Sequence, residues 1–200
     1  MAYPTVSNPY GFKPINRVDG MPYAGAIRQL PVTQAAAIYN GDVVAITTGG
    51  VIALAASGAS EITAANILGV LVGCQYTNSS GQTVQAQYYP GSSVTNAVAY
   101  VIDDPLAAYK VAVAYANATV TTVTRAAVGT NMSYYNGTGS ATTGDSGAFV
   151  TAASGANTAT LPFRVIAVVP ETATSATTYT EVIVKVNTDQ YNTALANNLS

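Results

Sequence analysis

The first thirty-one residues contain five of the nine prolines of the chain, and this spacing excludes a helix there. Proline fixes its own φ angle, lacks an amide hydrogen and pushes the preceding residue toward extended geometry. Aromatic side chains lie between these prolines and bring apolar area that favours burial. The segment is therefore predicted to run as an extended arm that lies against another surface. The five prolines are Pro4, Pro9, Pro14, Pro22 and Pro31.

Residues 1–34, here called the arm, are also the basic part of the chain. Up to residue 31 the sequence holds three cations against one acid, whereas the remainder holds four cations against eight acids. A basic, aromatic arm on an acidic body favours docking onto a partner, and an arm that wraps its own domain is the open alternative. A docking arm could be deleted without unfolding the body. Its contacts with the partner would be Tyr10, Phe12, Lys13, Arg17, Tyr23 and Arg28.

Charged residues are scarce. They make up 8% of the 200 residues, against about 25% in an ordinary soluble domain, while 49% are hydrophobic and the mean hydropathy is +0.27. The surface must therefore be built largely from uncharged residues, which contact other proteins with little charge repulsion or desolvation to oppose them. This composition predicts a chain that lives in an assembly and associates with other copies of itself.

The sequence disfavours several other classes of protein. No apolar run reaches the roughly 18–20 residues of a membrane span, and prolines interrupt the N-terminus where a signal peptide needs a continuous apolar core. The body has no basic cluster, so no nucleic-acid partner is expected. Cys74 is the single cysteine, cannot form an internal disulfide, and is expected to be buried among apolar neighbours.

The pattern of the remaining residues predicts β structure. Apolar residues alternate with polar or small ones, and turn clusters such as Asn40-Gly41 and residues 78–81 separate the alternating runs. The alternation is clearest in the last predicted strand. The predicted strands span 42–47, 51–54, 67–76, 82–89, 97–102, 109–115, 163–169 and 179–186.

Helix is expected only near residues 126–135 and in the segment 188–197. The fold class that follows is mainly β, with an antiparallel β-barrel or sandwich body over residues 35–187, built as one unit or as two small β lobes. The extended arm precedes this body, and a tail over residues 188–200 follows it.

One string resembles a catalytic signature. Residues 144–147 read Gly-Asp-Ser-Gly, like the nucleophile turn of trypsin-like proteases, but a serine hydroxyl needs a base, and this chain has no histidine. No lysine is spaced to replace it. We interpret the string as a turn, expect no enzymatic activity, and expect Ser146→Ala to leave folding intact.

Other candidate sites are weaker. The only adjacent carboxylates, Asp103 and Asp104, precede Pro105 in an ordinary turn pattern, and a calcium site would need more oxygen ligands nearby. Residues 137–139 lack the lysine and helix of a phosphate loop. We therefore expect no metal and no cofactor. Fourteen tyrosines without a tryptophan suit an interface, although strand positions such as Tyr109 are favoured as sheet-face residues.

Several strings taken together carry a family resemblance. They are residues 8–16, 22–25 and 27–32 in the arm, then 39–44, 100–105 with 109–111, 163–170 and 181–187. They resemble virion structural proteins of tailed bacteriophages, of the capsid decoration or cement type, and the resemblance spans most of the chain.

This resemblance implies a β-rich protein on the capsid exterior of the virion, made in the host cytoplasm. Its partners would be the major capsid protein, whose neighbouring subunits it clamps together, and its own copies in a trimer. The family supplies no catalytic residue. Two alternatives stay open: the major capsid protein itself, which needs a long spine helix, and a tail, fibre or surface β module that binds a host receptor or glycan.

Overall fold

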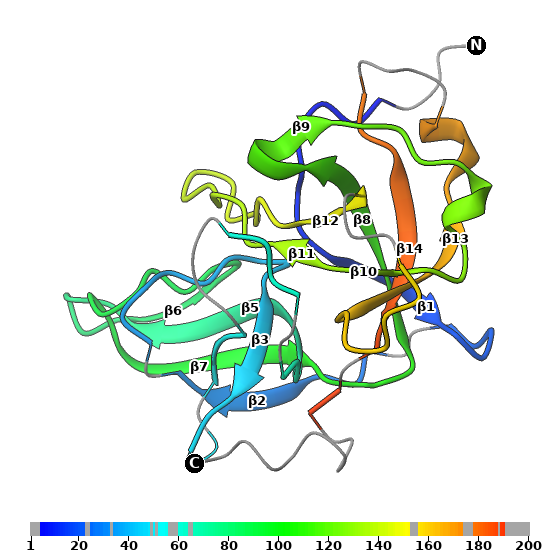
Figure 1. Ribbon diagram of the computed structural model, residues 1–200. Coiled ribbons are helices and arrows are strands. Elements are labelled where there is room, and N and C mark those ends of the chain that lie inside the picture. The colour runs from blue at the N-terminus through cyan, green and yellow to red at the C-terminus, as the bar shows by residue number, and fades with distance from the viewer. Residues whose placement is uncertain are drawn as a thin grey trace.

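A computed structural model of the chain describes residues 5–22, 25–32, 34–48, 50, 52–55, 60–63, 66–152, 156–173, 178–187 and 189–190. The described elements are strands and three-residue 3-10 turns, so the mainly β fold with little helix is confirmed (Figure 1). The strands are β1 Lys13–Arg17, β2 Arg28–Pro31, β3 Val43–Ile46, β4 Ile52–Leu54, β5 Gly69–Thr77, β6 Thr83–Ala86, β7 Thr95–Ile102, β8 Ala107–Tyr115, β9 Thr119–Val120, β10 Asn131–Met132, β11 Tyr134–Tyr135, β12 Phe149–Thr151, β13 Phe163–Val168 and β14 Glu181–Val186. The 3-10 turns are η1 Ala116–Ala118, η2 Arg125–Ala127 and η4 Pro170–Thr172.

One sheet forms a nearly closed barrel in the order β10-β13-β14-β8-β12-β11 (Figure 1). The strands at the two ends of this order, β10 and β11, are separated in sequence only by the buried Ser133. The chain therefore turns a corner there and brings the two ends of the sheet together, which leaves the barrel nearly closed. The central strand β8 also pairs with β1 and β9. Its alternation places Tyr109, Val111 and Val113 in the barrel core, as the sequence predicts, whereas Tyr115 is exposed.

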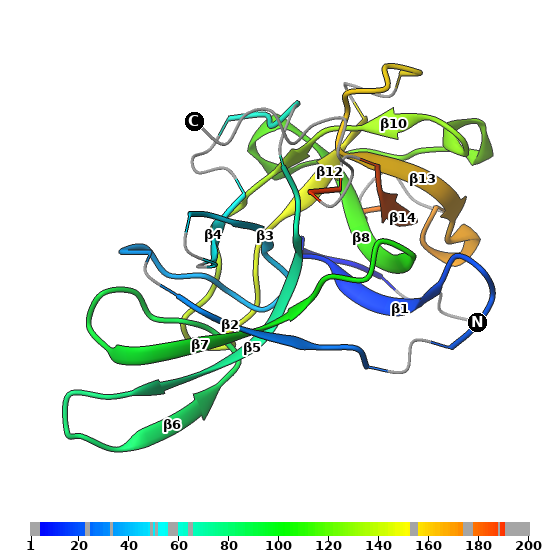
Figure 2. The same ribbon diagram turned by 90° about the horizontal axis from the view of Figure 1, so that it is seen from below.

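The second sheet is a half-barrel in the order β2-β7-β5-β3-β4, with β6 added to β5 (Figure 2). The nine-residue strand β5 pairs with β7 along its length and with β3 and β6 at its two ends. Its apolar residues face a cluster that includes Leu71, Cys74 and Val101. Cys74 is buried, as expected from the sequence.

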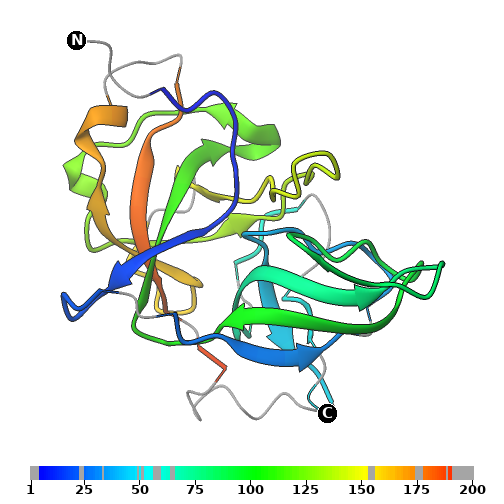
Figure 3. The same cartoon turned by 180° about the vertical axis from the view of Figure 1, so that it is seen from behind.

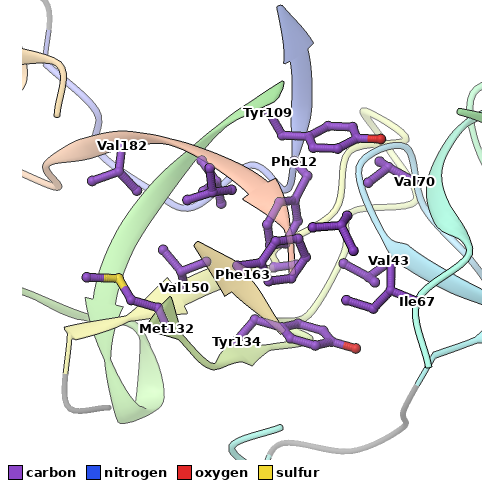
Figure 4. Packing of buried hydrophobic residues seen from close by; sticks show 14 of the residues in the cluster. Phe12, Val43, Ile67, Val70, Tyr109, Met132, Tyr134, Val150, Phe163 and Val182 are labelled. Carbon is purple, nitrogen blue, oxygen red and sulfur yellow. The ribbon is translucent and has the colours of Figure 1, made fainter. Parts of the chain in front are cut away.

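The two sheets share the largest core cluster. Val43, Val70 and Ile102 of the half-barrel belong to the same cluster as the inward-facing residues of the barrel. Phe12 of the arm lies inside this cluster with no exposed surface, and its ring stacks on Phe163 with centroids 4.5 Å apart (Figure 4). The body is thus built from two β lobes joined by one continuous core.

The arm is extended, but it is part of the body. Strand β1 pairs with β8 of the barrel, and β2 pairs with β7 of the half-barrel. Residue 34 therefore marks no boundary between an arm and a separate body. Pro14 and Pro31 fit because both strands are edge strands, where a missing amide hydrogen costs no ladder bond. The arm wraps its own domain, which is the second of the two alternatives left open by the sequence.

The helix expected near residues 126–135 is absent. Only η2 is helical, and Gly129, with φ of 87°, ends it before β10 and β11 begin. The pairing of these strands with β13 and β12 overrides the helix preference of the local sequence. Most of the second expected helix, 188–197, lies outside the described residues. Of it, Gln190 is described, and its side-chain amide makes two hydrogen bonds, of 2.9 and 2.8 Å, with the backbone of Ile46.

The burial of Phe12 leads to the first prediction. Phe12→Ala should lower the free energy of unfolding by about 3–5 kcal/mol, because it leaves a cavity between the two sheets. Ile27→Ala is the matched control, since this side chain of the same arm is 49% exposed and should change stability by less than about 0.5 kcal/mol. Denaturant unfolding followed by tyrosine fluorescence measures both. Equal stability of the two variants would contradict the assigned core.

Candidate interaction surfaces

The three cations of the arm are engaged within the chain. Lys13 Nζ lies 2.7 Å from Asp145 Oδ1, Arg28 Nε lies 2.8 Å from Asp103 Oδ2, and Arg17 faces both Asp19 and Asp104 at 3.2 and 3.5 Å. Pairs this exposed are worth at most about 1 kcal/mol each, but they neutralise the arm. The expectation that these cations face acids of a partner does not hold in the folded chain.

The aromatic residues of the arm are also used internally. Phe12 is fully buried, so its assignment as a partner contact is wrong. The Tyr10 hydroxyl donates a hydrogen bond to the Glu181 carboxylate, which Lys110 Nζ approaches at 3.1 Å. Burial, together with the bond to Glu181 and its charge, raises the pKa of Tyr10 above its usual range. Tyr23, the remaining predicted contact, lies outside the described residues.

A small apolar surface, here called the knob, faces the solvent beside the end of β1. It is formed by Val18 and Met21 of the arm and by Leu106 of the body. These side chains are 41%, 59% and 39% exposed. Two backbone hydrogen bonds bring these segments together. The Arg17 amide donates to the Met21 carbonyl at 3.0 Å across the turn after β1, and the Val18 amide donates to the Leu106 carbonyl at 2.9 Å, which joins this turn to the loop before β8. Figure 1 shows the turn that follows β1 at the edge of the molecule.

The knob has the properties of an interaction surface. Hydrogen bonds and the ion pair between Arg17 and Asp104 fix its backbone, so little ordering is needed when it contacts a partner. Clustered exposed apolar side chains mark such surfaces in soluble proteins. Sequence reasoning missed the knob because Leu106 comes from a distant loop. The one local signal is the Asp19-Gly20 turn flanked by Val18 and Met21.

The Gly-Asp-Ser-Gly string is a structural joint. Ser146 is 2% exposed, its hydroxyl donates to Asp42 Oδ1 at 2.6 Å, and it accepts the Ala148 amide at 2.9 Å. The hydroxyl is therefore engaged within the fold both as a donor and as an acceptor. Beside it Gly11 has φ of 80°, and a Cβ there would come within 2.7 Å of the Ser146 Cβ. Only glycine fits this crossing, which leads the chain directly to Phe12.

Asp42 is the buried partner in this joint. Its second carboxylate oxygen accepts the Tyr39 amide at 2.7 Å. Burial raises the pKa of Asp42 above its ordinary value of 3.8, and the hydrogen bonds from Ser146 and Tyr39 oppose the rise. The expectation that Ser146→Ala leaves folding intact is therefore revised: the substitution removes a donor to a buried carboxylate.

The remaining candidate groups are also engaged. Asp103 and Asp104 face Arg28 and Arg17, as described above. Among the described residues, no group of three or more acids or cysteines could hold a metal ion. The Cys74 thiol donates to the Tyr88 carbonyl at 3.0 Å, and burial raises its pKa to about 11. Within the same part of the chain, no helix is long and apolar enough to cross a membrane.

Comparison with known proteins found no match to a family model, to a curated protein or to a solved structure. The surfaces described above therefore rest on the geometry of this chain.

The joint leads to a second prediction. Ser146→Ala should lower the free energy of unfolding by about 1–3 kcal/mol, because Asp42 and the Ala148 amide each lose a partner. Thr142→Ala, an exposed substitution in the same loop, is the control and should have little effect. Chemical denaturation at neutral pH measures the difference, and a Ser146→Ala protein as stable as the control would contradict the joint.

The third prediction concerns pH. The Asp42 carboxyl holds its proton more tightly in the folded chain, so its contribution to stability is greatest below the unfolded pKa and is lost as the pH rises through the folded pKa. Asp42→Asn removes this titration. Its stability relative to the wild type should therefore rise between about pH 3 and pH 7. A relative stability that falls over this range would show that the native pKa is lowered instead.

Proposed function

We propose that this chain is a virion structural protein of the capsid decoration type, which binds the outside of an icosahedral phage head and stabilises contacts between major capsid subunits. The observation that carries the proposal is where the resemblance to such proteins falls. Residues 8–16 contain Phe12 and most of β1, and residues 100–105 contain Asp103 and Asp104 of the ion pairs. Residues 109–111 belong to β8, and residues 163–170 and 181–187 contain β13 and β14. These strings include several residues that the arm contacts: Tyr109 and Lys110 opposite β1, Tyr100 and Val101 opposite β2, Phe163 against Phe12, and Glu181 at Tyr10.

The chemistry of the surface supports the same function. Four of the seven cations and the candidate nucleophile Ser146 are engaged in contacts within the chain. Its knob is apolar and preorganised, which suits contact between copies of the chain. The major capsid alternative loses its support, because it requires a long spine helix and the helical elements among the described residues are three-residue turns.

Stabilisation of the head follows from linkage. A protein that binds the assembled lattice and not its loosened form stabilises the lattice by about 4 kcal/mol per site at a thousandfold excess over Kd. Attachment as a trimer raises the effective concentration of the second and third contacts, so individually modest contacts suffice. Together these contacts would resist the outward pressure of the packaged genome.

The fourth prediction tests this function on particles. In virions of the phage that encodes the chain, quantitative mass spectrometry should find hundreds of copies, and a cryo-EM map should place them on the outer head surface. Heads that lack the chain should disassemble at lower temperature. A handful of copies located at the tail would contradict decoration and favour the receptor-binding alternative.

The fifth prediction concerns the trimer. Met21→Glu places a charge on the knob and should dissociate the trimer, while folding stays intact because Met21 is largely exposed. Thr83→Glu adds the same charge on the exposed part of β6 and should not. Sedimentation velocity and the footprint on particles measure association. Trimeric Met21→Glu protein would show that the knob lies outside the contact between copies.

One observation favours the receptor-binding alternative. A groove of about 350 Å³ runs beside Asn8 and Pro9, with Thr138 and the stacked rings of Tyr135 and Phe149 in its lining. Polar side chains beside an aromatic face are the elements of a glycan site. Retention of the chain on a glycan array, lost in Tyr135→Ala, would support this alternative.

A further inference from the structure

The seven cations of the chain divide into two groups. Lys13, Arg17, Arg28 and Lys110 form ion pairs, as described above. The other three, Arg125, Arg164 and Lys185, form no ion pair within the described residues, which include all nine acids of the sequence.

Two of these cations are direct cross-strand neighbours. Arg164 of β13 lies opposite Lys185 of β14 in the register of the antiparallel pair. The two strands are the yellow-orange and orange ribbons that run side by side in Figure 3. Their strand neighbours Val165, Val184 and Val186 face the barrel core, so the two cations share the outer face. Like charges placed directly opposite each other destabilise a sheet. The strands on either side supply no compensating acid, because Arg164 is next to Asn131 of β10 and Lys185 is next to Ala108 of β8.

The third cation, Arg125, belongs to η2, the turn that packs on β13. The loop after η2 pairs with β13, because the Gly129 amide donates to the Val165 carbonyl at 2.9 Å and the Val165 amide donates to Thr130 at the same distance. The Arg164 guanidinium reaches this loop, since a Cβ on Gly129 would lie 4.0 Å from its Nη2 atom. The unpaired cations therefore gather on one side of the barrel, although the net charge of the chain is −2.

An apolar groove of about 570 Å³ lies along β13, where Ile166, Ala167 and Val168 are part of its lining. Arg125 is part of its lining, and Val128, which is 41% exposed, lies beside it. Glu171 of η4 follows the end of β13 and pairs with none of the three cations. The apolar part of the lining consists of Val123, Val128, Ile166, Ala167, Val168, Pro170 and Ala173.

We propose that this surface, the β13–β14 face, binds a protein segment in which carboxylates flank an apolar side chain. The apolar side chain enters the groove, and the carboxylates neutralise Arg125, Arg164 and Lys185. This assignment rests on the proposed function, under which the segment belongs to the outer surface of the major capsid subunit. Under this assignment the knob contacts other copies of the chain, and the β13–β14 face contacts the head.

The charges favour a protein over a nucleic acid. An acidic chain repels a polyanion at long range, and three cations are a small footprint for a phosphate backbone. An apolar groove beside the cations has a use only for a partner that also brings an apolar group. Complementary charges at the border of such a groove mainly increase specificity and the rate of association.

The opposed cations also predict a cost in the free chain. Replacing Arg164 and Lys185 by glutamine relieves their repulsion, so the double variant should melt at the same temperature as the wild type or higher. A pair that only stabilised the fold would lower the melting temperature when removed. Stability that rises while binding falls is the signature of side chains kept for a partner.

The test compares two variants whose net charge falls by the same two units. Arg164→Gln/Lys185→Gln changes the β13–β14 face, and Thr83→Glu/Gln85→Glu changes two exposed residues of β6. Each variant is co-sedimented with expanded phage heads over a series of salt concentrations. Each is also titrated, as ¹⁵N-labelled protein, with the peptide Glu-Glu-Leu-Glu-Glu and with a DNA duplex.

We expect Arg164→Gln/Lys185→Gln to lose at least about tenfold in affinity for heads at low salt and most of its salt dependence, while the β6 variant binds like the wild type. In the wild type, the peptide should shift the amide resonances of β13, β14 and η2. If both variants bind heads like the wild type, the surface is wrong and the proposed function stands.

The other outcomes separate the two proposals. Peptide shifts on this face without any binding to heads would support the surface and contradict decoration. The absence of both would contradict both. Tighter binding of the duplex than of the peptide would overturn the assignment to protein carboxylates.

Discussion

The fold depends on the ring of Phe12, which stacks on Phe163 and meets Tyr109 and Tyr134 edge to face. Neither of the two sheets is a complete barrel, because one is only nearly closed and the other is a half-barrel. The aromatic cluster lies where they meet and gives them a common core. Since Phe12 comes from the N-terminal segment, the first residues of the described chain hold the two lobes together rather than extend from them.

Polar groups secure this arrangement from outside the core. Gly11 and Phe12 form backbone hydrogen bonds to Ala148 and Gly41, at 3.1 and 3.0 Å, beside the bond between Ser146 and Asp42. The ion pairs of the arm attach it to loops of both lobes. A chain with so few charges thus uses most of its cations internally. The charged and apolar groups left over, which are the β13–β14 face and the knob, become informative about partners for that reason.

Local patterns predicted the strands well, but they did not predict which parts of the chain these strands pair with or pack against. The alternation in β8 and β14 separated the two faces of each strand, because period-2 burial is a property of the strand itself, although Tyr115 at the end of β8 is exposed. The fate of the arm depends on contacts of Phe12 with Phe163, which are distant in sequence, and no local pattern contains them. The unpaired cations were missed for the same reason, since the opposition of Arg164 and Lys185 appears only in the register of two strands. The sequence predicted a turn at Ser146 but not the joint with Asp42, because these two residues are far apart in the chain.

Native-state hydrogen exchange tests the central role of the N-terminal segment most directly. The amides of Gly11 and Phe12 donate to carbonyls of the two loops, and their exchange reports whether this segment opens separately from the body. If Phe12 holds the lobes together, these amides should exchange only through global unfolding, with the same free energy as the amides at the centre of β8 and β14. Exchange of Gly11 and Phe12 at a much lower free energy, while β8 and β14 stay protected, would show that the segment detaches from an intact body and would contradict the account.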